Sequence, residues 1–189
     1  MNLLEEIKKY KPLNEQESSD KEQMIEFIKK NKNYLLRENR LAHFTVSTWT
    51  VNKERTKILM VYHNIYDSWS WIGGHADGIE DLRSVALREL EEETGVKNAH
   101  LVSDDILSLE TLNVNGHTRR GEYVPSHLHF NITYLAEADE SETLVVNELE
   151  NKGVQWFTFE DALKVPHEPW FVEMVYKKLI ERSKKTKFI

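Results

Sequence analysis

The sequence contains no cysteine among its 189 residues. This absence excludes disulfide bonds, thiolate-ligated zinc or iron–sulfur sites, and cysteine nucleophiles. Long apolar runs are missing as well, because the longest, Ile58 to Tyr62, falls far short of the ~20 residues that a membrane span needs. The first residues, Met1 to Lys9, also lack the apolar block of a signal peptide. We therefore expect a cytoplasmic protein with no membrane partner.

The chain also lacks an excess of positive charge. Its 25 Lys and Arg residues stand against 32 Asp and Glu residues, which leaves a net charge of −7. Proteins that bind nucleic acid non-specifically usually carry a basic surface, so we expect no nucleic-acid partner. If such an acidic protein acts on phosphates, a divalent cation must supply the positive charge.

The length favours one globular domain with helical additions. The first forty residues have helical spacing of apolar side chains, with Pro12 ending one segment and a capping box at Ser19 to Glu22 starting the next. We expect a helical extension over residues 1–40, a catalytic domain over 41–165, and a C-terminal helix over 166–189. A homodimer formed through the helical ends is compatible with this division.

From His43 onward the sequence alternates strand and helix signals. We expect the central helix over 81–94, because Gly95 follows its last periodic residue. Asn115-Gly116 is typical of a hairpin turn between two strands. The expected strands are 43–51, 57–63, 107–114, 126–136 and 154–159, with a loop over 70–79 and further helices near 160–165 and 169–183. Strands mixed with helices predict an α/β or α+β sandwich.

The predicted helix over 81–94 carries a set of carboxylates. Glu89, Glu92 and Glu93 occupy positions i, i+3 and i+4, so they share one helix face. Mg²⁺ and Mn²⁺ prefer carboxylate and carbonyl oxygens and would relieve the repulsion among these charges. Arg88 can orient one of the carboxylates through a bidentate pair. An acidic, solvated helix face is the alternative interpretation of such a run.

The whole stretch resembles the Nudix box, G-x5-E-x7-R-E-U-x-E-E-x-G-U, where U is aliphatic. With average residue usage, a chance match at one starting point is on the order of one in a billion. Trp71 and Gly73 before the box also resemble the family. The matching positions are Gly74, Glu80, Arg88, Glu89, Leu90, Glu92, Glu93, Gly95 and Val96.

The resemblance implies a Nudix-type α/β/α sandwich with a mixed central sheet. It also implies a hydrolase that cleaves the diphosphate linkage of a nucleoside diphosphate joined to another moiety, by attack of metal-activated water on phosphorus. Mg²⁺ or Mn²⁺ would be held by Glu89, Glu92, Glu93 and the Gly74 carbonyl. Arg88, which we also place in the catalytic set, and Glu80 would mainly shape the loop and helix.

A further acid or base in this family often lies outside the box. Glu150 is our first candidate and Glu148 the second, because both precede the strand that contains Trp156. For each, a solvated loop carboxylate is the alternative interpretation.

Several basic side chains are candidates for substrate binding. His127 and His129 alternate on one predicted strand and so share a face, and His75 directly follows Gly74. Arg119 follows the predicted turn and can reach a substrate phosphate. Structural or solvated roles remain open for all four.

Two other functions are compatible with parts of the sequence. Isopentenyl-diphosphate isomerases share the fold, and His43 with Gly73-Gly74-His75 resembles their pattern, but they carry a catalytic cysteine where Gly73 stands. A non-catalytic nucleotide-binding sensor is the second alternative, although such proteins typically lose box glutamates. The proline typical of ADP-ribose hydrolases is replaced by Glu110-Thr111, and the element of NADH-selective members is absent. These motifs therefore do not identify a particular substrate.

Overall fold

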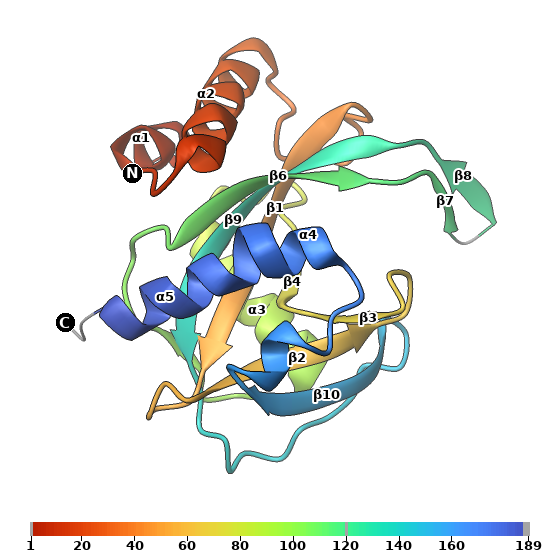
Figure 1. Ribbon diagram of the computed structural model, residues 1–189. Coiled ribbons are helices and arrows are strands. Elements are labelled where there is room, and N and C mark those ends of the chain that lie inside the picture. The colour runs from red at the N-terminus through yellow and green to blue at the C-terminus, as the bar shows by residue number, and fades with distance from the viewer. Residues whose placement is uncertain (1, 120, 187–189) are drawn as a thin grey trace.

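A computed structural model describes residues 2–119 and 121–186 and shows one mixed β-sheet with helices on both sides (Figure 1). The predicted α/β sandwich is therefore confirmed. The α-helices are α1 Leu3–Lys9, α2 Glu15–Lys30, α3 Leu82–Thr94, α4 Pro169–Phe171 and α5 Lys177–Lys185, with a 3-10 helix at Asp161–Leu163 and a π-helical turn at Val172–Tyr176. The strands are β1 Ala42–Val51, β2 Lys57–His63, β3 Ser68–Ser70, β4 Ile72–His75, β5 His100–Leu101, β6 Ser108–Val114, β7 His117–Arg119, β8 Glu122–Val124, β9 His127–Glu137 and β10 Asn151–Thr158.

Strands β1 and β9 form the centre of the sheet. They pair in parallel along their whole length, whereas the other strand pairs of the described chain are antiparallel. On one side of β1 the sheet divides, because β2 pairs with the end of β1 at Val51 and β4 pairs with residues 45–48. The division brings the box-bearing loop, which begins in β4, against the middle of the sheet.

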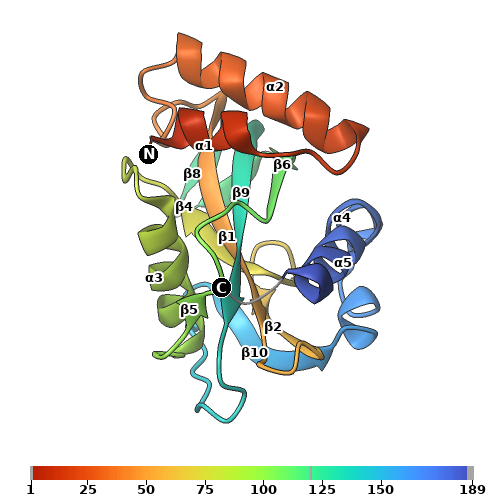
Figure 2. The same cartoon turned by 90° about the vertical axis from the view of Figure 1, so that its left-hand side faces the viewer.

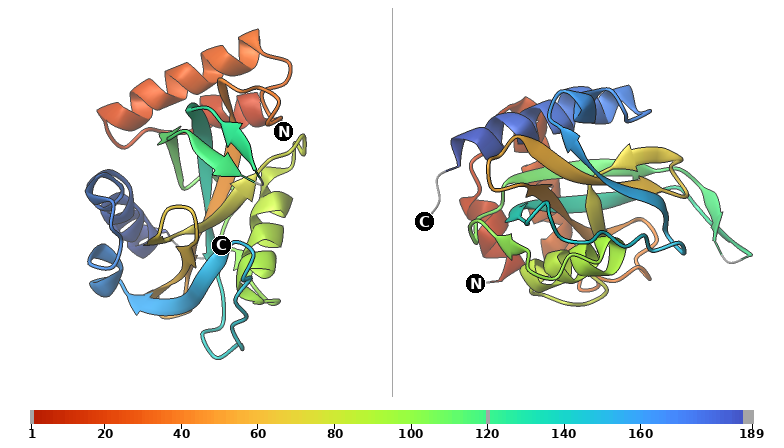
Figure 3. Two further views of the ribbon diagram at one scale, coloured as in Figure 1. Left: turned by 90° about the vertical axis from the view of Figure 1, so that its right-hand side faces the viewer. Right: turned by 90° about the horizontal axis from the view of Figure 1, so that it is seen from below.

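Helices cover the two faces of this sheet. Seen from below, α5 lies on one face and α3 on the other (Figure 3). Trp49 of β1 and Tyr176 pack with their rings 5.6 Å apart on the α5 side. Val85 of α3 belongs to the cluster that contains Phe44 of β1 on the opposite side. None of the helices in the described part of the chain has the length and apolar character that a membrane crossing requires.

The two N-terminal helices lie across one end of the sheet (Figure 2). Ile7 of α1 and Met24 of α2 are fully buried in the same cluster as Phe44. Helix α2 begins at Glu15, so the start predicted from the capping box at Ser19 is wrong. Asn14 caps the helix instead, because its side chain accepts a hydrogen bond from the Glu17 backbone at 2.9 Å.

The predicted turn at Asn115-Gly116 is also wrong. Strands β6 and β9 pair as expected, but the chain between them continues into the two-stranded ribbon of β7 and β8, which projects from the sheet (Figure 1). The predicted loop over 70–79 contains strand β4, because residues 72–75 pair with residues 45–48 of β1. The Gly116 backbone donates to the Ser126 hydroxyl at 2.9 Å, which holds the base of the ribbon.

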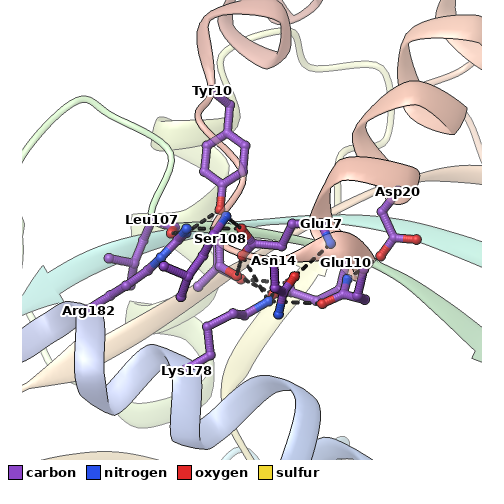
Figure 4. A network of polar contacts seen from close by, with 12 residues as sticks. Tyr10, Asn14, Glu17, Asp20, Leu107, Ser108, Glu110, Lys178 and Arg182 are labelled. Carbon is purple, nitrogen blue, oxygen red and sulfur yellow. Dashed lines mark hydrogen bonds and ion pairs between the residues drawn. The ribbon is translucent and has the colours of Figure 1, made fainter.

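A buried network of ion pairs connects helices α2 and α5 to strand β6 of the sheet (Figure 4). Lys178 of α5 lies 2.9 Å from Glu17 of α2 and 2.9 Å from Glu110 of β6, and both carboxylates are fully buried. Arg182 pairs with Glu17 at 2.9 Å and also donates to the Tyr10 hydroxyl. Because each buried charge has a partner, the network joins α2, β6 and α5 in one arrangement.

Candidate metal and catalytic site

Helix α3 positions most of the candidate side chains. Its apolar residues Val85, Ala86 and Leu90 are buried against the sheet, which fixes how the helix is rotated. Gly95 ends the helix with a φ of 75°, a left-handed conformation that favours glycine. The rotation directs the polar positions next to this apolar stripe toward β4 and the start of β10.

Glu93 is the most deeply buried of the box carboxylates, with 2% of its surface exposed. The Gly73 backbone N–H donates to one carboxylate oxygen at 3.1 Å, and the Asn151 amide donates to the other at 2.9 Å. Burial nevertheless raises the pKa of Glu93 to about 8, because the low-dielectric surroundings disfavour its charged form. The site thus holds a carboxylate that lacks a compensating positive charge in the protein itself.

Glu89 lies one helical turn before Glu93 and faces the same side. Burial also raises the pKa of Glu89, although Arg88 donates to its carboxylate at 2.8 Å. A Cβ atom on Gly74 would lie 2.3 to 2.6 Å from the Glu89 carboxyl atoms, so a side chain at this position would displace the Glu89 carboxylate. Glycine at the start of the box therefore lets the carboxylate reach the β4 backbone.

Glu150 joins this pair from the turn that precedes β10. One carboxylate oxygen from each of Glu89, Glu93 and Glu150 lies within 4.8 Å of the others. The Glu150 backbone accepts from the Asn64 N–H at 2.8 Å, which holds the turn against the end of β2. Among the described residues, Glu148 is not part of this group.

Glu92 takes a different position from the one expected. Its side chain is 57% exposed and lies 3.7 Å from Arg88, outside the group of three carboxylates. Successive residues of a helix turn by ~100°, so Glu92 lies ~100° around the axis from Glu93 and points toward solvent. Glu92 nevertheless stays beside Glu89, because both carboxylates contact Arg88 and the charge of Glu92 helps to raise the pKa of Glu89, after the larger effect of burial.

The histidine candidates form a second cluster with a residue that the substrate-binding prediction did not include. His75, His127 and His129 surround His43, with ring centroids 5.1, 5.0 and 4.8 Å from the His43 ring. His75 directly follows Gly74, so the two clusters are neighbours along β4. The side chain of Arg119 lies outside the described residues.

Sequence reasoning missed two other parts of the site. Asn151 is buried at the start of β10 and binds Glu93, and Gly73 contributes only its backbone. A polar residue next to Glu150 and directly before a strand is a weak local signal for Asn151. The pairing of β10 with β2 and the folding of α3 over β4 bring these groups together, and neither contact is visible in the local sequence.

This fold and site define an α/β sandwich domain in which the central helix α3 and the turn before β10 bring three carboxylates together. Residues 41–178 match the family model of the NUDIX domain. The chain therefore belongs to the Nudix family, and it is a Nudix hydrolase. No curated protein matches the chain by sequence.

Solved structures show the same fold. The MutT protein from Methanosarcina mazei Go1 is 18% identical with a TM-score of 0.55, covering 78% of this chain and 99% of that one. The Ap4A hydrolase of C. elegans, as a binary complex, is 18% identical with a TM-score of 0.54, covering 75% and 95%. A NUDIX family hydrolase from Clostridium perfringens is 22% identical with a TM-score of 0.52, covering 72% and 95%.

Proposed function

We propose that this Nudix hydrolase uses Mg²⁺ or Mn²⁺ to cleave the diphosphate linkage of a nucleoside diphosphate joined to another moiety. The observation that carries the proposal is the convergence of Glu89, Glu93 and Glu150 within 4.8 Å. Three carboxylates at this separation repel one another, and the raised pKa of Glu93 expresses the cost of burying one of them. A hard divalent cation removes that cost.

The residues present fit such a cation. All the side-chain donors are carboxylate oxygens, which suit Mg²⁺ and Mn²⁺ better than softer metals. The side-chain oxygen of Asn151 is buried beside Glu93 and has no hydrogen-bond partner among the described residues. We propose that Glu89 and Glu93 are ligands, with the Gly74 carbonyl and Glu92 as further oxygen donors. A bound cation would supply charge neutralisation at the phosphate oxygens and would acidify an attacking water.

The protein's own groups have separate roles in the proposed reaction. Arg88 orients Glu89 through the 2.8 Å hydrogen bond, and the Gly73 N–H and Asn151 hold Glu93 in place. Glu150 is the exposed member of the group, so we propose it as the general base that accepts the proton of the attacking water. Because its carboxylate is open to solvent, it can also release that proton after each turnover.

We propose that His75, His127 and His129 line the substrate groove and that Arg119 contacts a phosphate. The sensor alternative is disfavoured because every box glutamate is present. Two features oppose the isomerase alternative: the absence of any cysteine and the glycine at position 73. We also propose residues 41–165 as the catalytic domain, with cytoplasmic location.

Hydrolysis of a substrate panel tests the proposal. Nucleoside triphosphates, oxidised nucleotides, ADP-ribose, nucleotide sugars, dinucleoside polyphosphates and isoprenoid diphosphates would be incubated with Mg²⁺ or Mn²⁺, and in parallel with EDTA. We expect cleavage of at least one nucleotide class that EDTA abolishes. Cleavage that persists in EDTA, or no cleavage in the whole panel, would contradict the proposed activity.

A pair of variants tests the assignment of the base. Glu150→Gln is expected to lower kcat by ~100-fold, the usual scale of general base catalysis. Glu148→Gln is the matched control, because it changes a neighbouring exposed carboxylate outside the group of three. Equal kcat values for the two variants would show that Glu150 is not the general base.

A further inference from the structure

Three histidines from three adjacent strands form a triangle next to the carboxylate cluster. His43 of β1 lies opposite His129 of β9, because these strands pair in parallel at that position. His75 ends β4 on the other side of β1, opposite Thr45. The ring centroid of His43 is 5.1 Å from that of His75 and 4.8 Å from that of His129, and the last two are 4.9 Å apart.

The separation of their nitrogen atoms suits a metal ion. One ring nitrogen from each histidine lies within 4.8 Å of the other two. A point equidistant from three atoms at that spacing is ~2.8 Å from each of them. Inward movement of each ring by ~0.7 Å therefore reaches the zinc–imidazole bond length of about 2.0 to 2.1 Å. Small side-chain rotations suffice for this movement and leave the strand pairing unchanged.

His43 presents an unsatisfied nitrogen to this triangle. The residue is 3% exposed, and its Nδ1 lies 3.1 Å from the Asn39 carbonyl, which assigns the proton to Nδ1. Its Nε2 therefore carries a lone pair, and this buried atom has no hydrogen-bond partner among the described residues. A buried acceptor without a partner is costly, whereas a histidine that donates one N–H to a carbonyl and offers its other nitrogen is typical of a metal ligand.

His127 positions the third histidine. Its Nδ1 lies 2.9 Å from the Pro125 carbonyl, so its Nε2 can accept from the Nε2–H of His129 at 3.1 Å. This arrangement leaves the lone pair of His129 on Nδ1. Burial lowers the pKa of both His129 and His43, which keeps the two rings neutral and able to donate lone pairs.

We propose that His43, His75 and His129 bind one divalent transition metal ion at a site separate from the carboxylate cluster. Three imidazole nitrogens favour a borderline ion such as Zn²⁺, whereas the all-oxygen cluster favours Mg²⁺ or Mn²⁺. The positive charge of Arg37 near these rings is offset by its pairing with Asp77 at 2.6 Å. A three-histidine site leaves a fourth coordination position open for water or a substrate oxygen.

The test is a titration of the protein with Zn²⁺ in which isothermal titration calorimetry measures the affinity and the number of ions bound. Metal-free protein is titrated in excess Mg²⁺, which occupies the oxygen ligands and leaves the imidazoles for Zn²⁺. We expect one Zn²⁺ per chain, with affinity reduced at least ~100-fold in His43→Gln and His129→Gln, and ~10-fold in His127→Gln. His100→Gln is the matched control, because it changes an exposed histidine of β5. Glu93→Gln separates the two sites and should leave Zn²⁺ affinity unchanged.

Two results would overturn the proposal. The first is unchanged Zn²⁺ affinity in both His43→Gln and His129→Gln, and the second is loss of the Zn²⁺ in Glu93→Gln. Circular dichroism of the metal-free variants shows whether the buried substitutions fold. If they do not, Co²⁺ bound to the wild-type chain gives the answer by visible absorption: an intense four-coordinate spectrum supports the histidine site, and a weak six-coordinate spectrum contradicts it. Neither readout requires a substrate, so failure here is distinguishable from failure of the proposed hydrolysis.

Discussion

Glu93→Gln should abolish metal-dependent hydrolysis and yet stabilise the metal-free fold. The carboxylate is 2% exposed, and in the absence of a cation its charge is opposed by burial. Glutamine has nearly the same shape and can still accept the Gly73 N–H with its oxygen. Its amide nitrogen takes the place of the carboxylate oxygen that accepts from the Asn151 amide at 2.9 Å, so the Asn151 amide has to turn over and present its oxygen, which has no partner among the described residues. The substitution thus removes a buried charge, and the neutral Asn151 N–H that loses its acceptor costs less than that charge.

The expected increase in the free energy of unfolding becomes larger as the pH rises. Burial raises the pKa of Glu93 from 4.5 to about 8, so below pH 4.5 the carboxyl is protonated in both the folded and unfolded states and carries no penalty. The penalty grows by about 1.4 kcal/mol for each pH unit above 4.5, reaches ~3 kcal/mol at pH 7, and becomes constant above pH 8. The free energy of unfolding of Glu93→Gln should therefore exceed that of the wild type at pH 7 in EDTA by up to ~3 kcal/mol, less the cost of the Asn151 N–H that loses its acceptor.

Urea denaturation in EDTA at pH 5, 7 and 8.5 measures this difference. Glu91→Gln is the matched control, because Glu91 lies on the same helix but is exposed, and it should change the free energy of unfolding by less than ~0.5 kcal/mol. A Glu93→Gln variant that is less stable than the wild type at pH 8.5, or a difference that does not vary with pH, would refute the reasoning.

Three further changes have defined outcomes. Lys178→Met leaves the buried Glu110 carboxylate without its cation and leaves Glu17 with Arg182 alone, so it should lower the free energy of unfolding by ~3–5 kcal/mol in urea denaturation. The exposed Lys177→Met should change this free energy little, and equal effects would contradict the role of the network. Gly74→Ala places a Cβ against the Glu89 carboxylate and should lower kcat by ~100-fold with unchanged circular dichroism, so wild-type turnover would contradict that contact. Asn14→Ala removes the N-cap of α2 and should lower the free energy of unfolding by ~1 kcal/mol in urea denaturation. An unchanged midpoint would show that the cap does not stabilise the helix.

The sequence alone determined the helix of the box and one of the strands that precede the box. Helix α3, its end at Gly95 and strand β2 occur where the hydrophobic period and the glycine predict them. These features depend on residues within one or two turns of each other, and such short-range patterns can be read from a sequence. The start of α2 was predicted wrongly because both Asn14 and Ser19 are acceptable caps, and only packing against the sheet decides between them.

The tertiary structure decided which charged and ionisable groups meet. Glu92 and Glu93 are neighbours in sequence, yet the rotation of α3 on the sheet buries one and exposes the other. Glu150 reaches the same cluster only because β10 pairs with β2, and His43 meets His129 only because β1 and β9 pair in parallel. Register between distant strands depends on the packing of the whole core, whereas residue spacing along the chain reports only on the nearest turns.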